Sequence, residues 1–149
     1  MTPLQAPADL PDLNIWLALA WRGHSHHDAA CRYWEGAAAD TVLFTTVTAL
    51  GLVRLLSQPR VMGEAALSLR QASDVQAAFL QQPGVRLVDE AAASWPVFRH
   101  LLSQDAWPPR LCTNVHLAAL AIDGGWRLVS FDQDFGRFKG LSWLSLPGP

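Results

Sequence analysis

The segment WRLVSFDQDF, residues 126–135, joins an apolar run to two carboxylates and gives the clearest indication of the fold class. The run is short and apolar, as in a buried strand, and it opens onto Asp132 and Asp134. The preceding segment TNVHLAALAI, residues 113–122, has the spacing of a helix that starts near Asn114. A helix that leads into a buried strand ending in acid is typical of a parallel α/β sheet.

The same alternation of helices and strands extends over the rest of the chain. Strands are predicted at residues 41–46, 85–88, 127–131 and, as an edge strand, 141–146. Helices are predicted at residues 15–21, 28–39 (with Asp28 as N-cap), 47–58, 64–82, 90–102 (with a break at Pro96) and 113–125 (with Thr113 or Asn114 as N-cap). The pattern predicts one α/β domain over residues 1–149, with a mostly parallel sheet covered on both faces and a flexible lead at residues 1–7.

Composition limits the class of protein. Of the 149 residues, 50% are hydrophobic and 16% are charged, which indicates a globular domain. The net charge is −2 without a basic tail, so bulk positive charge would not hold a nucleic acid. Two cysteines in a chain with a full core indicate free thiols in a reducing compartment. Neither a basic signal region nor an apolar stretch of about 18 residues is present, which predicts a soluble, cytoplasmic protein without a membrane span.

Polar residues fall where the predicted strands end. Asp12 ends a short extended segment, Asp132 follows a strand, and Asn114 starts a helix at the same edge of a parallel sheet. Ligands bind at the carboxyl edge of such sheets, and clustered carboxylates need a cation. Their hard oxygen atoms suit Mg²⁺ or Mn²⁺. Each residue is also a good helix cap, a role that requires no function.

Other catalytic classes fit less well. Asp132-Gln133-Asp134 after a strand is similar to the nucleophile motif of haloacid-dehalogenase-like phosphatases, but that motif opens its domain, and fifteen residues follow Asp134 here. A response-regulator receiver needs a lysine at a late strand end, where Lys139 does not sit. Three histidines in the turn at residues 24–27 lack the cysteine spacing of a zinc site and favour a solvated loop.

The order of motifs resembles a PIN domain of the toxin class in bacterial VapBC toxin–antitoxin pairs, from residue 9 to residue 146. The motifs that carry the resemblance are PDLNIWLAL, HSHHDAACRYWEG, TTVTALGLVRLLSQPRVMG, TNVHLAALAIDGG and LVSFDQDFGRFKGL. Each motif is weak alone, but their order and spacing together are fairly specific.

The resemblance implies an α/β/α sandwich and a Mg²⁺-dependent endoribonuclease. It implies a homodimer whose site is covered by the C-terminal segment of an antitoxin. On this chain, Asp12 and Asp132 correspond to metal-binding acids, Asn14 completes the opening Asp-x-Asn, and Ser130 replaces a threonine. Arg54 falls in the family's Gly-x-x-Arg-Leu segment, where it would contact RNA or, as we favour, hold an acid in place.

Two positions depart from the family pattern. Ala49 stands where the family has Glu or Gln, and Asn114 stands where it has an acid. Asp134 and Glu90 are the candidate substitutes. Asparagine keeps an oxygen ligand but removes a full charge, so two hypotheses follow. The protein is a Mg²⁺- or Mn²⁺-dependent endoribonuclease weakened or inactivated through Asn114, or it is a non-cleaving PIN domain that binds an antitoxin and dimerises.

Overall fold

A computed structural model describes residues 8–148, so the predicted flexible lead at residues 1–7 lies outside the described part. The strands are β1 (Ala8–Pro11), β2 (Thr41–Phe44), β3 (Val85–Leu87), β4 (Arg127–Ser130) and β5 (Trp143–Ser145). The helices are α1 (Leu13–Ala20), α2 (His27–Gly36), α3 (Thr46–Leu56), α4 (Pro59–Met62), α5 (Leu69–Leu80), α6 (Ser94–Ser103) and α7 (Cys112–Gly124). Short 3₁₀ helices are η1 (Gly63–Ala65), η2 (Pro109–Leu111) and η3 (Gln133–Arg137).

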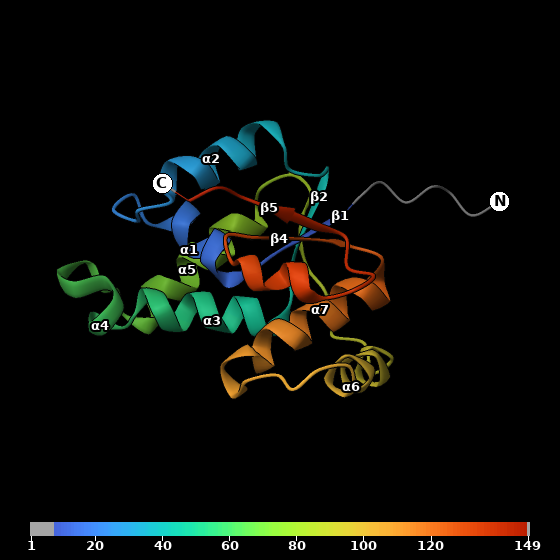
Figure 1. The fold of residues 1–149 in the computed structure, drawn as a ribbon. Helices are drawn as coiled ribbons and strands as arrows, with labels where there is room; N and C mark the ends of the chain where they lie inside the picture. Colours follow the sequence, from blue (N-terminus) through green and yellow to red (C-terminus); the bar gives the residue numbers. More distant parts are fainter. Residues whose placement is uncertain (1–7, 149) are drawn as a thin grey trace.

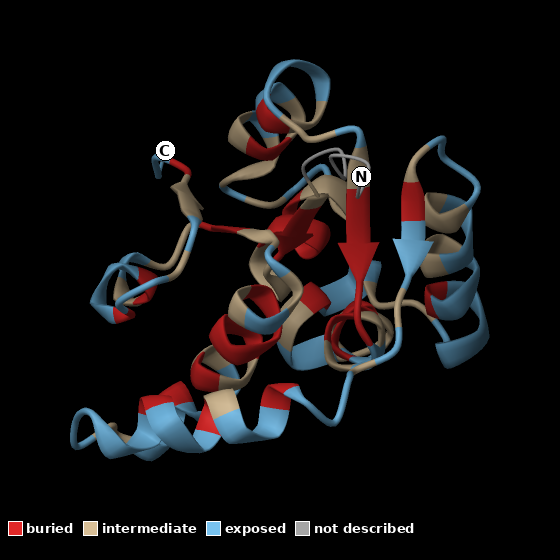
Figure 2. Ribbon diagram, turned by 90° about the vertical axis from the view of Figure 1, so that its right-hand side faces the viewer, coloured by how far each residue is buried: buried red, intermediate tan, exposed pale blue. Residues whose placement is uncertain are grey.

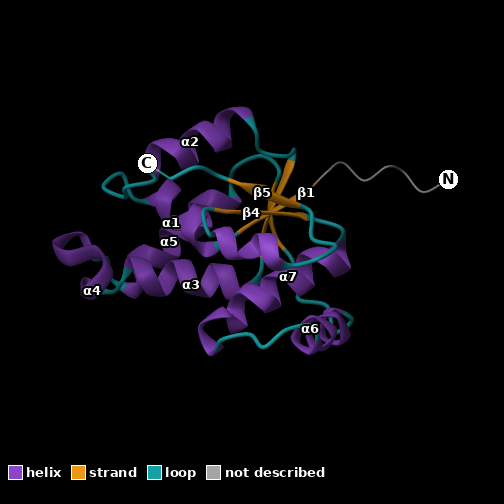
Figure 3. Ribbon diagram, viewed as in Figure 1, coloured by secondary structure: helices purple, strands orange, loops and turns teal. Residues whose placement is uncertain are grey.

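The strands form one parallel sheet in the order β3-β2-β1-β4-β5, with helices on both faces (Figures 1 and 3). The predicted α/β sandwich is therefore confirmed, including the edge strand near the C-terminus. β1 and β4 lie side by side in the middle of the sheet, with Pro11 opposite Val129. This register brings the ends of two strands that are far apart in sequence to the same edge.

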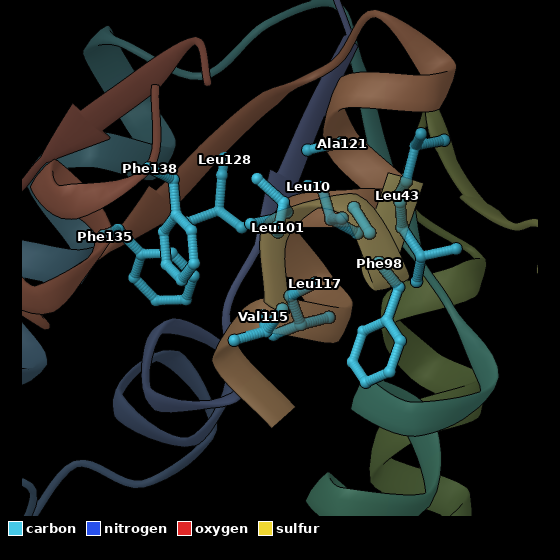
Figure 4. Packing of buried hydrophobic residues seen from close by; sticks show 13 residues of the cluster. Leu10, Leu43, Phe98, Leu101, Val115, Leu117, Ala121, Leu128, Phe135 and Phe138 are labelled. Atoms are coloured by element: carbon cyan, nitrogen blue, oxygen red, sulfur yellow. The ribbon is translucent and has the colours of Figure 1, made fainter. Parts of the chain in front are cut away.

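Each face of the sheet has its own hydrophobic core, because alternate strand residues point to opposite faces. Leu10, Leu43 and Leu128 pack with residues of α6, α7 and η3 (Figure 4). On the other face, Val42 and Phe44 of β2 pack with residues of α1, α3 and α5. Figure 2 shows mostly buried strands in the middle of the sheet between partly exposed helices, whereas the edge strand β3 is largely exposed and β5 is half-buried. Fully burying each such side chain contributes about 1.5–3 kcal/mol, so both layers are needed to hold the sheet.

Several predicted boundaries are wrong for local reasons. The helix predicted at residues 64–82 starts later, because Ser68 and Gln71 form a capping box at the start of α5. The helix predicted at residues 90–102 starts at Ser94, which places Pro96 in the first turn of α6. Proline loses no helical hydrogen bond in that turn, so the predicted break is absent.

The other differences are small. Asp28 is not the N-cap of α2; His26 occupies that position, and Asp28 lies in the first turn. A carboxylate in the first turn still stabilises the helix through the helix dipole. The predicted strands at residues 41–46, 85–88 and 127–131 each end one or two residues earlier, because the following residues turn toward helices. Within residues 8–148, no helix has the length and apolar character needed to cross a bilayer.

Candidate active site

The candidate site lies at the carboxyl edge of the sheet, where β1 and β4 end. Asp12 follows β1, Ser130 is the last residue of β4, and Asp132 lies two residues further. The Ser130 hydroxyl donates to Asp12 Oδ2 at 2.8 Å and accepts the Asp132 backbone N–H at 2.9 Å. Ser130 is fully buried, so its hydroxyl is a fixed link between the two acids.

Asn14 completes the hydrogen bonding of this link. It lies in the first turn of α1, and its Nδ2 donates to Ser130 Oγ at 3.2 Å. Asp12 itself caps α1, because its Oδ1 accepts the Leu13 N–H at 2.7 Å. The Asp-x-Asn motif therefore supplies both the acid, Asp12, and the amide, Asn14, that holds the serine orienting this acid.

Asn114 reaches the same cluster from α7. Its Nδ2 donates to Asp132 Oδ2 at 2.9 Å. The prediction that Thr113 or Asn114 caps this helix is wrong, because α7 begins at Cys112 with Leu111 in the cap position. The Asn114 amide is thus directed at Asp132 rather than at its own helix. A carboxylate at position 114 would face another carboxylate at this distance, an arrangement that needs a cation.

The electrostatics of the cluster also favour a cation. Burial raises the pKa of Asp12 above its ordinary value, and the nearby charge of Asp132 raises it further. Hydrogen bonds from Ser130 and from the Leu13 N–H lower this pKa but do not fully offset the burial. Asp12 and Asp132 together form an anionic pair whose charge the protein compensates only in part.

Asp134 and Glu90 have other partners. The Asp134 backbone N–H donates to Asp132 Oδ1 at 2.9 Å, while its carboxylate pairs with Arg110 at 3.1 Å. Glu90 accepts the Val47 N–H at the start of α3 and pairs with His116 at 3.2 Å. None of the hydrogen bonds or ion pairs of Glu90 within residues 8–148 joins it to Asp12 or Asp132.

Two residues of α3 lie apart from the cluster. Arg54 is exposed and, in the described part of the chain, makes no ion pair; it lines a groove of about 450 Å³ with Val47, Leu50, Val53 and Leu69. Ala49 packs against the hydrophobic core beside the sheet. The partner of Asp134, Arg110, was missed by sequence reasoning, because its only signal is its position shortly before α7.

The oxygen atoms of the cluster suit a hard divalent ion. No group of three or more His, Cys, Asp or Glu residues in the described chain is arranged to hold a metal. The cluster offers a metal two carboxylates, those of Asp12 and Asp132. Mg²⁺ is commonly bound through one or two carboxylates, with water and substrate phosphate oxygens completing its coordination. Two carboxylates with an adjacent amide therefore fit Mg²⁺ or Mn²⁺.

Comparison with known proteins identifies the family. Residues 10–141 match the PIN domain model, and the chain belongs to the PIN domain family. Within that family it is related to VapC proteins. Ribonuclease VapC41 of Mycobacterium tuberculosis is 35% identical over 140 residues, which cover 89% of this chain and 94% of the relative. Ribonuclease VapC37 of the same organism is 33% identical over 142 residues, covering 91% and 95%.

Solved structures share the fold at lower identity. VapBC2 from Rickettsia felis, bound to a DNA fragment from its promoter, has a TM-score of 0.67 at 15% identity and covers 93% of this chain and 98% of its own. Mycobacterium tuberculosis VapC20, described as a Sarcin-Ricin loop cleaving toxin, has a TM-score of 0.67 at 20% identity and covers 87% and 93%. These two structures confirm the fold, and the match to the PIN domain model together with the VapC relatives confirms the resemblance to VapC proteins.

Proposed function

We propose that this protein is the toxin of a type II toxin–antitoxin pair and a Mg²⁺- or Mn²⁺-dependent endoribonuclease. The observation that carries the proposal is the buried Ser130 hydroxyl, which joins Asp12 and Asp132 beside Asn114. Relatives named Ribonuclease VapC match nearly the whole chain, which supports RNA as the substrate. The VapBC2 neighbour supports a cognate antitoxin as partner. The family resemblance also favours a homodimer.

Asp12 and Asp132 are the residues that would hold the metal. A bound divalent ion activates water for attack and stabilises negative charge on the phosphodiester. Ser130 orients the Asp12 carboxylate, and Asn14 holds the serine by donating to its oxygen. Such supporting hydrogen bonds keep ligands in the geometry that the chemistry needs.

Asn114 weakens this site. Its amide offers one oxygen, but it removes the negative charge that an aspartate would supply, and its Nδ2 is turned toward Asp132. Losing even an outer partner of a metal ligand costs about 10–100-fold in affinity or activity. We expect the loss of a charged ligand to cost at least that much.

The alternative is a non-cleaving PIN domain that binds an antitoxin and dimerises. Two observations favour it. The Asn114–Asp132 hydrogen bond partly satisfies the acid without a cation. The groove lined by Arg54 is otherwise apolar, and two of its lining residues, Leu50 and Leu69, are 65% and 66% exposed. Exposed apolar surface of this kind is typical of a protein–protein contact.

Calorimetric titration with MnCl₂ separates the two functions. We expect the protein to bind Mn²⁺ weakly, the Asn114→Asp variant to bind it at least about tenfold more tightly, and the Asp12→Ala variant not to bind it. Cleavage of RNA in Mn²⁺ by the variant that binds best completes the test. If neither the protein nor Asn114→Asp binds Mn²⁺, the enzyme proposal fails and the binding role replaces it.

A further inference from the structure

Three side-chain pairs join the segment at residues 105–114 to η3 and its cap. Asn114 pairs with Asp132 at 2.9 Å, Arg110 pairs with Asp134 at 3.1 Å, and Asp105 pairs with Arg137 at 3.1 Å. Residue numbers fall along the first segment as they rise along η3, so the two segments run in opposite directions. The three pairs form a ladder that starts at the candidate active site and runs outward along η3. A 3₁₀ helix rises about 2 Å per residue, so Arg137 lies roughly 10 Å along the helix from Asp132.

The outer end of the ladder opens into a polar cleft. It has a volume of about 340 Å³ and is lined by Gln104, Asp105, Trp107, Arg137 and Lys139. Trp107 Nε1 donates to the Leu101 carbonyl at 2.8 Å, and its ring stacks on Phe138 at 4.7 Å. The Trp107 ring is therefore fixed at the edge of the cleft.

The fixed ring holds a cation in place. The Arg137 guanidinium lies 4.6 Å from the centre of the Trp107 ring. Phe135 and Phe138, on either side of Arg137, are buried and anchor η3 in the core (Figure 4), while Arg137 and Lys139 are exposed. A guanidinium held over an aromatic ring presents a flat, preorganised cationic surface to solvent.

Three cationic side chains lie along the ladder, and the two arginines among them each pair with a carboxylate. The chain has a net charge of −2 and one lysine, yet that lysine and two arginines, Arg110 and Arg137, lie along this track. Asp134 and Asp105 hold the two arginines through exposed or partly exposed ion pairs, which contribute only about 0–1 kcal/mol. A phosphate can replace such a carboxylate, because the arginine fork binds phosphate in two-point geometry.

We propose that this cleft is an RNA-binding subsite for the strand next to the scissile phosphate. Arg137 and Lys139 bind a backbone phosphate there, and Arg110 binds a phosphate closer to Asp132. A base next to the bound phosphate stacks on the Arg137 guanidinium, as unpaired bases do on arginine planes. The proposal rests on the proposed ribonuclease function, because it names where that substrate lies.

The test is fluorescence anisotropy with a short fluorescein-labelled single-stranded RNA in EDTA, repeated over a range of salt concentrations. Lys139→Ala and Arg137→Ala should each weaken binding roughly tenfold, the factor for one hydrogen bond to a charged group. Each should also reduce the slope of log affinity against log salt by about 0.7. Asp105→Asn should tighten binding, because it removes a carboxylate that competes with phosphate. Arg70→Ala, an exposed change on α5, is the matched control and should change neither quantity.

A purely structural role for the cleft predicts a different pattern. Arg137→Ala would then lower the melting temperature without changing the salt slope, and Asp105→Asn would not tighten binding; this pattern overturns the proposal. The proposal is also overturned if none of the forms, including the unmodified protein, binds RNA at roughly 100 µM protein, the weak limit of non-specific affinity. Cleavage by Asn114→Asp without dependence on Arg137 or Lys139 overturns the subsite alone. The predicted binding pattern without cleavage by any form overturns the ribonuclease function alone.

Discussion

Replacing Arg127 with alanine should destabilise the protein strongly, because it leaves a carboxylate buried in the sheet. Asp9 is completely buried and lies opposite Arg127 in the β1–β4 pairing. Arg127 Nε and Nη2 donate to its two oxygens at 2.8 and 2.9 Å. The Tyr33 hydroxyl and the Ala39 N–H donate the other two hydrogen bonds. The pair fixes the strand register that brings Asp12 beside Ser130 at the opposite edge of the sheet.

The expected loss of unfolding free energy depends on the hydrogen bonds that Asp9 keeps in the variant. Removing one partner of a buried ion pair costs about 3–5 kcal/mol. Tyr33 remains a donor, because burial and the Asp9 contact raise its pKa above the ordinary value and keep its hydroxyl protonated. We therefore expect the lower half of that range for Arg127→Ala, about 3–4 kcal/mol. A domain of this size loses about 2–4 °C of melting temperature per kcal/mol, so the drop should be roughly 6–16 °C.

Urea unfolding and differential scanning calorimetry measure this loss. The matched control is Arg110→Ala, which removes an arginine that is 66% exposed from its ion pair with Asp134. That change should cost less than about 1 kcal/mol. An unfolding free energy that Arg127→Ala lowers no more than Arg110→Ala does would mean that Arg127 does not stabilise the buried Asp9 carboxylate.

Three further predictions concern the site and the turns around it. Asp12→Asn should raise the melting temperature in EDTA and remove any stabilisation by Mn²⁺, because the raised pKa of Asp12 means that its charged form destabilises the metal-free fold. For the same reason, the stability gained by protonating Asp12 grows as the pH falls through its raised pKa. A lower melting temperature for the variant in EDTA would contradict this. In calorimetry, Gly84→Ala should lower stability far more than Gly125→Ala. Both glycines have positive φ, 81° and 69°, but a Cβ at residue 84 would also clash with a backbone carbonyl. Equal losses of stability would count against this. Glu90→Gln should leave Mn²⁺ affinity unchanged in calorimetric titration, because its carboxylate pairs with His116; a large loss of affinity would make Glu90 a ligand.

Much of the fold was predictable because hydrophobic periodicity is local. The apolar runs that contain Val42 and Leu128 indicated buried strands, and their alternation with helices indicated a parallel sheet. Helix starts were less predictable, because cap signals are short and not every helix has one. Ser68 is the N-cap of α5, whereas Ala93 occupies the cap position of α6 and makes no side-chain cap hydrogen bond.

The candidate site was predictable only in part. Parallel topology indicated that Asp12, Asn114 and Asp132 share one edge. In the structure Ser130 joins Asp12 to Asp132, and Asn114 donates to Asp132. The sequence did not reveal which way the Asn114 amide points. That direction depends on where α7 begins relative to η3, which is a property of the packed fold. The ladder of pairs along η3 was hidden for the same reason.

RNA cleavage in Mn²⁺, with the protein and its Asn114→Asp variant assayed side by side, shows whether Asp12, Asp132 and residue 114 form a metal-dependent nuclease site. Asp12→Ala, built into the Asn114→Asp background, controls for contaminating nucleases. We predict that Asn114→Asp cuts RNA at least about tenfold faster than the protein itself and that the Asp12→Ala control does not cut. Failure of both forms to cut several kinds of RNA, single-stranded and looped, would contradict the account.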